Sequence, residues 1–547
     1  MSVEWDLTVD FVSVGSGMAG AASALAAADM GLEAVIVEKS ELLGGSAAHS
    51  YGILWVPVNH LESREGVDDS PEQARRYLLW LGAERQSLEH VDAYLRYAPE
   101  ALEYFERVGG IQFYPIKGLS DHFYPVGPGT TEFGRCIQVR PFEAAALGGW
   151  QPLLRHSMYV ERVTWEEMAQ WGGRNNERNW DHTVLAERQA KDIRTFGAGL
   201  VGSFLAGGLR RGVKIFNSTL IQRLVVEDDR VVGLECTRQG ERFNVRARHG
   251  VLLGTGLYGA NPRLVTWFDE FAPMPTHRAP SATQGDGLVL AMEHGAAIHI
   301  QHGTLAIHLS YAVPGETDEG IPVGREVGLR ELAAPHTLLV NRAGERFGDE
   351  SFFEDIAIKL RQFDLWRHEY VNRPCFLIFD QAFWDTYALE PNEPGGPVPD
   401  WLTPADSLQE LGSKLGVDGD RLAATVERFN AFADQGRDGD FHRGEALAWV
   451  KQVTGDLTGR GKNPNLGPVR IPPFYGLNLF PSDAREAGLV TNAQGQVIHV
   501  RGRAIPGLYA CGEVAAQLHV GVGYQAGFTL TGAMTFGYRA AHHATGA

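Results

Sequence analysis

The chain has 547 residues, 44% of them hydrophobic and 21% charged, a composition typical of a globular protein with room for two or more domains. Its formal net charge of −18 argues against non-specific binding to nucleic acid or to an anionic membrane. The four cysteines are scattered without a C-x-x-C pair, so we expect no metal site and no disulfide framework, and we expect a reducing compartment.

The N-terminal segment resembles neither a secretion signal nor a membrane anchor. Residues 1–6 contain no basic side chain, and the apolar segment Ala21–Met30 includes Asp29 and is too short to span a bilayer. We therefore expect a soluble, cytoplasmic protein.

Residues 10–38 are predicted to form a strand, a glycine turn, a helix and a second strand. The apolar run Phe11–Val14 leads directly into the sequence GSGMAG, which has the pattern Gly-x-Gly-x-x-Gly. The Ala- and Leu-rich segment Ala21–Met30 favours a helix that ends at Gly31, and Ala34–Val37 favours a strand that ends at Glu38.

This arrangement is typical of a dinucleotide site. Gly15 permits the tight turn, Gly17 lets the backbone approach a pyrophosphate, and Gly20 lets the helix pack on the strand. The N–H groups at the helix start bind phosphate, and Glu38 is placed to accept a hydrogen bond from a ribose hydroxyl.

The residues after Glu38 indicate which dinucleotide is bound. The run Lys39 to Ser46, with the sequence KSELLGGS, resembles the FAD-dependent fumarate reductase and 3-ketosteroid dehydrogenase superfamily, in which Glu-Lys…Gly-Gly-Ser leads towards the flavin. The resemblance implies FAD as the cofactor. It implies an α/β fold with a Rossmann-like two-dinucleotide-fold FAD-binding domain that includes a β-meander, residues 1–282 and 462–547, and an inserted α+β substrate domain, residues 283–461.

Later blocks of the chain fit the same arrangement. Residues 220–234 alternate like a β-meander, residues 250–256 form a strand that runs into glycines, and residues 507–514 form a strand that ends in Gly-Glu before a final helix. The resemblance implies FAD contacts at these positions: Gly15, Gly17, Ala19, Gly20, Glu38, Lys39, Gly44, Gly45, Ser46, Ala48, Gly52, Gly254, Thr255, Gly256, Asp286, Gly512, Glu513, Thr529 and Leu530.

The glycine-rich loop at residues 521–528 separates two branches of the superfamily. The dicarboxylate-reducing branch has an Arg in this loop and another after a central hairpin, whereas this chain has Tyr524 and Glu354 there. A carboxylate pocket without both cations would repel its ligand, so we do not expect a fumarate-type reductase. The chain looks closest to the ketosteroid and cyclohexanone dehydrogenase branch, where a Tyr hydroxyl and a Gly N–H bind the ketone, which implies these roles for Tyr524 and Gly527.

The residue at the position of the catalytic base differs from the one in that branch. Residues 338–347 resemble a hairpin of that branch, and the branch's base is a Tyr just beyond this hairpin. This chain has Phe353 or Glu354 at that place. A carboxylate shielded by phenylalanines can have a raised pKa and act as a base, so Glu354 is one candidate, and Tyr311 and Tyr124 are alternatives. Tyr124 is also preferred to His122 as the aromatic residue that lines the substrate pocket.

The predicted reaction is FAD-dependent α,β-dehydrogenation of a cyclic ketone, with hydride transfer to flavin N5. The substrate is a 3-ketosteroid or a smaller cyclohexanone-type ketone, and an external acceptor, namely a quinone, a dye or oxygen, removes the electrons. Two alternatives stay open: an ene-reductase that acts on enones in the reverse direction, and a flavoprotein that binds FAD without a substrate of its own.

Overall fold

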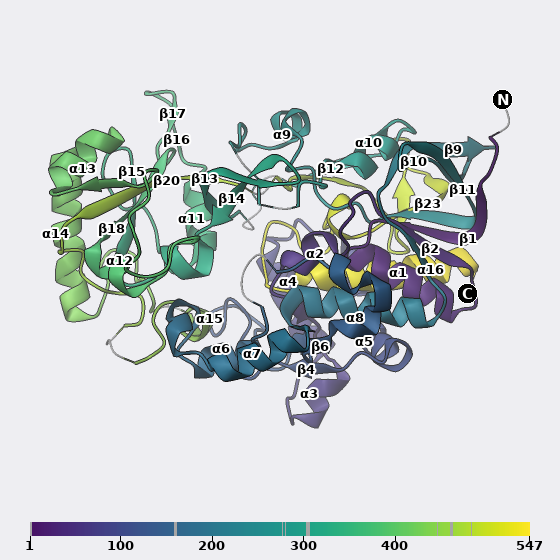
Figure 1. The fold of residues 1–547 in the computed structure, drawn as a ribbon, viewed down its shortest axis with the longest axis horizontal. Helices are drawn as coiled ribbons and strands as arrows, with labels where there is room; N and C mark the ends of the chain where they lie inside the picture. The colour runs from purple at the N-terminus through teal and green to yellow at the C-terminus, as the bar shows by residue number, and fades with distance from the viewer. Residues whose placement is uncertain are drawn as a thin grey trace.

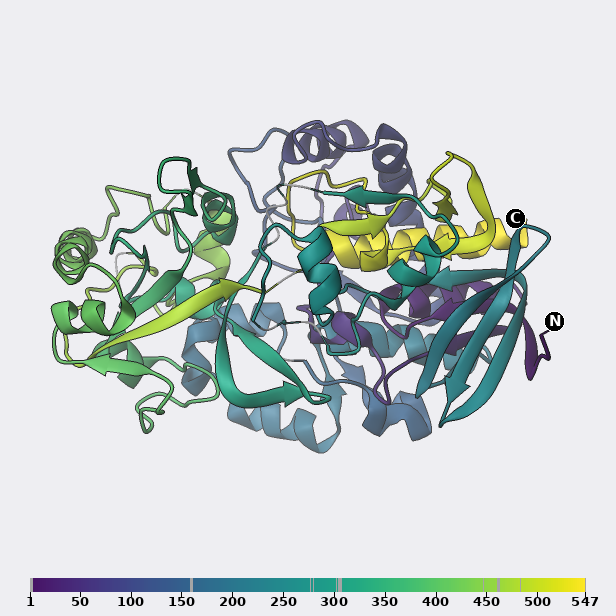
Figure 2. The same ribbon diagram turned by 90° about the horizontal axis from the view of Figure 1, so that it is seen from above.

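The computed structural model describes residues 3–157, 161–275, 277–278, 280–301, 303, 307–445, 447–459, 463–482 and 484–546. The molecule has two lobes (Figure 1). One lobe contains the larger sheet and both chain termini, and the other contains a second sheet and the helices α12 to α14. Figure 2 shows the antiparallel meander of the larger sheet on the side of the first lobe away from the second lobe.

The larger sheet has the order β22-β23-β11-β1-β2-β8, and β9 and β10 extend β11 as the expected meander. Its parallel pairs are β1 with β2, β1 with β11, β2 with β8 and β11 with β23. The strands are β1 (Leu7–Val14), β2 (Ala34–Val37), β8 (Lys214–Phe216), β9 (Thr219–Glu227), β10 (Arg230–Arg238), β11 (Glu241–Leu253), β22 (Gln496–Ile498) and β23 (Ala504–Ala510). This arrangement confirms the predicted fold class.

Helices cover one face of this sheet. The central helix α1 is rich in Ala, so α8 and α16 approach it closely, and α5 packs on both of these helices. The helices of this region are α1 (Met18–Asp29), α2 (Gly45–His49), α3 (His60–Arg64), α4 (Pro71–Leu81), α5 (Leu88–Gly109), α6 (Trp165–Gln170), α7 (His182–Ala190), α8 (Phe196–Arg210) and α16 (Phe528–Thr545), with 3-10 segments at Ala144–Leu153, Arg174–Asn179 and Gly512–Val514. Short strands here are β3 (Leu54–Trp55), β4 (Phe113–Pro115), β5 (Cys136–Val139), β6 (Phe142–Glu143) and β7 (Ile193–Arg194).

The other face of the sheet packs on a smaller apolar core. This core includes residues of the meander and of α10, and the pair β12 and β21 lies beside it. The elements are α9 (Pro262–Phe268), α10 (Asp286–Met292), β12 (Ile298–Ile300) and β21 (Ala487–Leu489).

The second lobe is built on a mixed α and β arrangement. Its sheet has the order β14-β13-β20-β18-β15, with β19 beside β20, and apolar cores lie on both of its faces. The strands are β13 (Leu309–Asp318), β14 (Ile321–Glu326), β15 (Thr337–Asn341), β16 (Phe363–Asp364), β17 (Glu369–Tyr370), β18 (Cys375–Asp380), β19 (Thr403–Ala405) and β20 (Phe474–Pro481). The helices are a π-helical turn (Gly328–Leu332), α11 (Phe353–Lys359), α12 (Gln381–Thr386), α13 (Leu408–Leu415), α14 (Gly419–Gln435) and α15 (Ala448–Val453).

Strand pairing bears on where the inserted unit begins and ends. The predicted boundary between residues 461 and 462 lies outside the described residues. Strand β20 follows that boundary in sequence but pairs with β13, β18 and β19, whereas β12 pairs with β21 of the first lobe. We therefore propose that the substrate unit runs from β13 to β20, Leu309 to Pro481.

The strand ends of the larger sheet converge at one edge, which places the site. Gly15 N–H donates to Val37 O at 2.8 Å, Gly254 N–H to Val14 O at 2.8 Å, and Cys511 N–H to Leu253 O at 3.2 Å. Three blocks far apart in sequence therefore meet at the carboxyl ends of parallel strands, where ligands bind in open α/β sheets. Among the described helices, none is both long and apolar enough to cross a membrane.

Candidate active site

A continuous cavity runs from the carboxyl ends of β1, β2 and β11 to the loop before α16. Its empty volume is about 1980 Å³ with its opening to solvent included. The second lobe contributes part of the wall through Glu326, Phe353 and Trp449, and His308, just before β13, adds to it. The cavity therefore lies between the two lobes and is large enough for a dinucleotide together with a substrate.

The glycine turn after β1 forms one end of the cavity. Gly15 has φ +93°, and a Cβ there would lie 2.5 Å from Gly254 O, so only glycine fits between the two strand ends. A Cβ on Gly20 would lie 1.8 Å from Gly15 O, so the third glycine is needed for packing of the helix on the turn. Gly17 caps α1 without a side chain, and Met18 and Ala19 of the first turn line the cavity. The helix start is therefore available to a phosphate group.

Two hydroxyl groups in the wall lack a partner. Ser46 Oγ and Thr255 Oγ1 are buried and make no hydrogen bond with any described residue, and both residues line the cavity. Buried hydroxyls are normally hydrogen-bonded, so these groups point to a polar ligand. Together with the glycine turn, they fit an FAD molecule that extends along the cavity.

Glu38 is fixed at the end of β2. Its Oε2 accepts hydrogen bonds from Ser16 N at 2.8 Å and from Ser16 Oγ at 2.7 Å, and its Oε1 accepts one from Ser40 N at 2.8 Å. The residue also lines the cavity, and a carboxylate oxygen has more than one acceptor site. The predicted contact with a ribose hydroxyl fits this geometry and stays a prediction.

Two ion pairs hold the cavity wall together. Lys39 Nζ lies 2.9 Å from Asp286 Oδ2, which ties the end of β2 to the start of α10. Arg485 Nη2 lies 2.6 Å from Glu513 Oε1, at the carboxyl end of β23. All four residues line the cavity, so these charges are fixed where a cofactor would lie.

Most of the predicted FAD contacts face the cavity. The lining residues among them are Gly15, Gly17, Ala19, Glu38, Lys39, Gly45, Ser46, Gly52, Gly254, Thr255, Gly256, Asp286, Gly512, Glu513, Thr529 and Leu530. Gly20, Gly44 and Ala48 lie behind the wall. Gly44 has φ +105°, and a Cβ there would lie 2.9 Å from Ala48 Cβ, so these two residues pack against each other.

Tyr524 and Gly527, the two predicted ketone donors, both lie at the other end of the cavity. Both residues line it, and neither the Tyr524 hydroxyl nor the Gly527 N–H makes a hydrogen bond with a described residue. Gly527 has φ +102° and caps α16, and a Cβ there would lie 2.4 Å from Trp55 N. Burial raises the pKa of Tyr524 to about 12, although Arg485 opposes the shift, so the hydroxyl keeps its proton. The pair can donate two hydrogen bonds to a carbonyl oxygen.

The three residues predicted as candidate bases do not line the cavity. Glu354, on α11, is buried behind His122, and its Oε1 lies 2.8 Å from His122 Nδ1. His122 lines the cavity, whereas Glu354 does not. The direct contact with substrate that was predicted for Glu354 is therefore not supported by its position.

Tyr124 and Tyr311 also lie outside the cavity wall. Tyr124 is the last residue of a turn in which its N–H donates to Asp121 O at 3.1 Å. Within this turn His122 lines the cavity and Tyr124 does not. The preference for Tyr124 over His122 as a lining residue is thus corrected. Tyr311 belongs to the core of the second lobe, where its hydroxyl donates to Glu390 O at 2.6 Å.

Several lining residues were not predicted. Trp449 of α15 packs on His122 with ring centroids 4.1 Å apart. Arg278 Nη1 lies 2.7 Å from Glu326 Oε2, and both of these residues also line the cavity. His308 stacks on Phe353 at a centroid distance of 4.9 Å. These residues belong to no sequence motif. They reach the cavity only through contacts between distant segments, so the sequence could not indicate them.

The chain matches the FAD binding domain family over residues 10–530. This chain belongs to that family. The predicted resemblance is confirmed, FAD is the cofactor, and the protein is an FAD-dependent oxidoreductase.

Members with assigned activities resemble it over nearly their whole length. The 3-oxosteroid 1-dehydrogenase of Mycobacterium tuberculosis is 35% identical over 98% of this chain and 98% of its own. The 4-oxocyclohexanecarboxylate 2-dehydrogenase of Sinomonas cyclohexanicum is 32% identical over 97% of this chain and 92% of its own. The crystal structure of 3-ketosteroid delta1-dehydrogenase from Sterolibacterium denitrificans, solved with 1,4-androstadiene-3,17-dione, has a TM-score of 0.87 and 28% identity, and the match covers 98% of this chain and 99% of that chain.

Proposed function

We propose that this protein introduces a C=C bond α,β to the carbonyl of a cyclic ketone. The observation that carries the proposal is the free donor pair of Tyr524 and Gly527, which faces the FAD cavity. Relatives that share nearly the full chain are named as dehydrogenases of a 3-oxosteroid and of 4-oxocyclohexanecarboxylate, which supports a ring ketone as substrate.

The ketone oxygen accepts hydrogen bonds from the Tyr524 hydroxyl and the Gly527 N–H. These bonds strengthen as negative charge builds on the oxygen, so they acidify the neighbouring α-carbon and stabilise the enolate. Phe353 and Trp449 line the chamber around the donors and keep water away from the ring. FAD, when bound, supplies the hydride acceptor at flavin N5.

The enzyme needs an electron acceptor after each turnover. FAD accounts for the Gly-x-Gly-x-x-Gly turn at residues 15–20 and for the acidic Glu38 that follows it. We propose that an external acceptor, namely a quinone, a dye or oxygen, takes the electrons.

The anaerobic visible spectrum of the purified yellow protein tests the reaction and its substrate. A 3-ketosteroid, cyclohexanone and 4-oxocyclohexanecarboxylate are added in separate titrations. Bleaching of the flavin by any of them supports the dehydrogenase, and the ketone that bleaches at the lowest concentration identifies the ring class. If none bleaches the oxidised enzyme but an enone reoxidises the reduced enzyme, the reductase direction replaces this proposal.

A further inference from the structure

A histidine and a glutamate form a buried pair beside the ketone donors. His122 Nδ1 lies 2.8 Å from Glu354 Oε1, and the exposed fractions of the two side chains are 0% and 1%. The His122 ring centroid lies 5.5 Å from that of Tyr524. The residue that lines the cavity is His122, and Glu354 lies behind it.

The hydrogen bonds of His122 define which ring nitrogen carries the proton. Nδ1 faces a carboxylate, so it donates, and Nε2 accepts a bond from Ala526 N–H at 3.3 Å. Ala526 lines the cavity and lies between Tyr524 and Gly527 in the sequence. The lone pair on Nε2 therefore points at the loop that contains Tyr524 and Gly527, and it accepts a long hydrogen bond from Ala526 N–H that a substrate can displace.

The imidazole is held on several sides. Gln525 Oε1 accepts hydrogen bonds from His122 N–H at 2.9 Å and from Tyr77 OH at 2.7 Å, which fixes the backbone of residue 122. The Trp449 ring packs against the imidazole at a centroid distance of 4.1 Å. A base fixed in this way pays little reorganisation cost when it reacts.

Glu354 suits a supporting role. Its Oε2 is buried and makes no hydrogen bond with any described residue, so the polar contact of this side chain is the one with His122. A buried carboxylate in this position holds the tautomer of a neighbouring imidazole and stabilises the imidazolium that forms when the imidazole takes a proton.

We propose that His122 Nε2 removes the α-proton of the ketone and that Glu354 is its positioning residue. The α C–H bond breaks, a bond from Nε2 to hydrogen forms, and the electron pair of the C–H bond becomes the enolate, whose oxygen Tyr524 and Gly527 hold. This proton transfer is redox-neutral and needs no oxidant. The inference rests on the proposed ketone chemistry and assigns the base that the phenylalanine at position 353 cannot supply.

Enolisation can be measured apart from hydride transfer. The holoenzyme is reduced with dithionite under anaerobic conditions in D₂O, so it cannot accept a hydride, and proton NMR follows the exchange of the α-protons of the ketone that bleaches it best. Wild-type enzyme should catalyse exchange. His122→Ala should lower the exchange rate on the order of 10²-fold or more, and added imidazole should restore part of it. Glu354→Gln should lower the maximal rate about 10-fold and leave the half-saturating ketone concentration unchanged.

Two further variants keep the result interpretable. His122→Asn preserves a polar side chain of similar size, so it guards against misfolding of the Ala variant, and a retained flavin spectrum reports an intact cofactor site in each. His308→Ala tests a second histidine that lines the cavity. Exchange at the wild-type rate in both His122 variants, or its loss in His308→Ala alone, would overturn the assignment. Wild-type enzyme that neither exchanges nor bleaches with any of the three ketones would instead refute the proposed function.

Discussion

At the scale of single residues, the pKa of Tyr524 is set by burial and by nearby arginines and glutamates with opposite effects. Arg485, paired with Glu513, and Arg278, paired with Glu326, both act on Tyr524, and the two arginines lower the pKa that burial raises to about 12. The phenol therefore stays protonated in neutral solution and is available as a hydrogen-bond donor. A protonated donor is what a developing enolate needs.

Tyr524→Phe should lower turnover on the order of 10²-fold and leave FAD bound, because the variant loses one donor to the enolate but keeps the ring that packs in the wall. Steady-state kinetics with an artificial acceptor and the flavin spectrum measure the two effects. Tyr311→Phe is the matched control, since it removes a buried tyrosine hydroxyl outside the cavity and should leave turnover within about twofold. Equal effects of the two variants would remove Tyr524 from the mechanism.

Glu62 shows how a buried carboxyl makes stability depend on pH. Its Oε2 accepts from Asn59 N at 2.8 Å in the capping box of α3, and its Oε1 makes no hydrogen bond with any described residue. Burial, then the charge of Asp69, raises the pKa of Glu62 from 4.5 to about 8. The folded protein thus keeps this proton to about pH 8, whereas the unfolded chain loses it near pH 4.5, so the stability from this group falls as pH rises between those values.

Glu62→Gln should remove this pH dependence. The amide oxygen can still accept from Asn59 N, and the variant should be more stable than wild type by roughly 1–3 kcal/mol near pH 8, with little difference near pH 5. Denaturant unfolding of the holoprotein at both pH values measures the difference. Glu72→Gln, at an exposed position of α4, serves as control. Identical pH profiles for wild type and Glu62→Gln would contradict the prediction.

At the scale of elements, the hairpin of β13 and β14 reaches from the second lobe to the cofactor lobe (Figure 1). Glu319 at its tip accepts from Arg155 Nη2 at 2.7 Å and from Ser40 Oγ at 2.6 Å, and Asp318 Oδ2 accepts from Ser281 N at 2.7 Å. Arg155 lines the cavity, so the hairpin tip holds part of the cofactor wall in place.

Glu319→Ala should release FAD about fivefold faster than wild type, because a partly exposed ion pair contributes about 1 kcal/mol. Recovery of flavin fluorescence after dilution measures the rate. Glu316→Ala is the matched control, since Glu316 lies in the same hairpin but pairs with Arg325 of the neighbouring strand at 2.8 Å. If both variants release FAD at the same rate, the contact between the lobes does not retain the cofactor.

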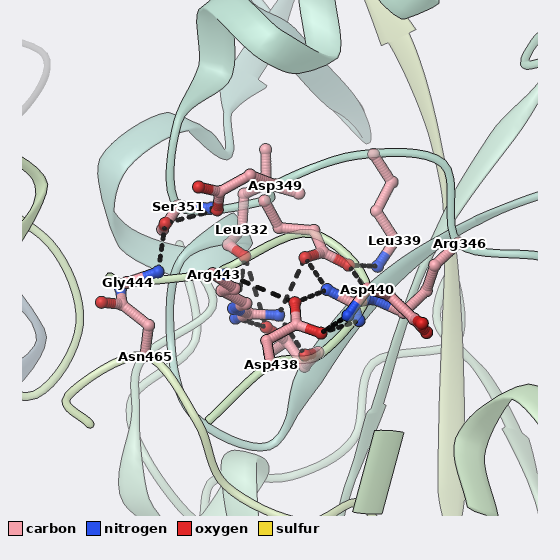
Figure 3. A network of polar contacts seen from close by, with 12 residues as sticks. Leu332, Leu339, Arg346, Asp349, Ser351, Asp438, Asp440, Arg443, Gly444 and Asn465 are labelled. Carbon is pink, nitrogen blue, oxygen red and sulfur yellow. Dashed lines mark hydrogen bonds and ion pairs between the residues drawn. The ribbon is translucent and has the colours of Figure 1, made fainter. Parts of the chain in front are cut away.

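At the scale of the whole molecule, a buried polar network holds the second lobe together (Figure 3). Arg346 Nη2 lies 2.6 Å from Glu350 Oε2 and 2.8 Å from Asp438 Oδ2. Arg443 donates to the carbonyl oxygens of Thr337 at 2.7 Å and Ala334 at 2.6 Å, and Leu339 N donates to Glu350 Oε1 at 3.2 Å. The network joins the loop after α14 to the strand β15 and to the segment that carries α11 and Glu354.

Arg443→Met should destabilise the protein by about 3–5 kcal/mol, because it leaves the buried carbonyl oxygens of Thr337 and Ala334 without their charged donor. Thermal unfolding of the holoprotein should show a Tm lower by roughly 3–4 °C, because the unfolding entropy of 547 residues is about 1.1 kcal/mol/K. Arg428→Met removes an exposed pair with Asp440 in the same lobe and should cost less than about 1 kcal/mol. Similar losses for the two variants would mean that burial of the network adds nothing to stability.

Much of the cofactor site could be predicted because each part of it is local in sequence. A strand, a glycine turn and a helix start within residues 7–29 fix the positions of Gly15, Gly17 and Ala19, whatever the rest of the chain does. The position of Glu38 at the end of β2 could be predicted because it depends only on the lengths of one helix and one strand. The expected β-meander likewise needs only neighbouring strands and tight turns.

The amino-acid sequence by itself determined the fold class and the cofactor FAD, since short motifs encode both, and it predicts Tyr524 and Gly527 as ketone donors. Tertiary structure alone decided which groups stand beside those donors. His122 and Glu354 are 232 positions apart, and Trp449 joins them from a helix of the second lobe. No periodicity or spacing encodes such a meeting, because it depends on how the two lobes pack around the cavity.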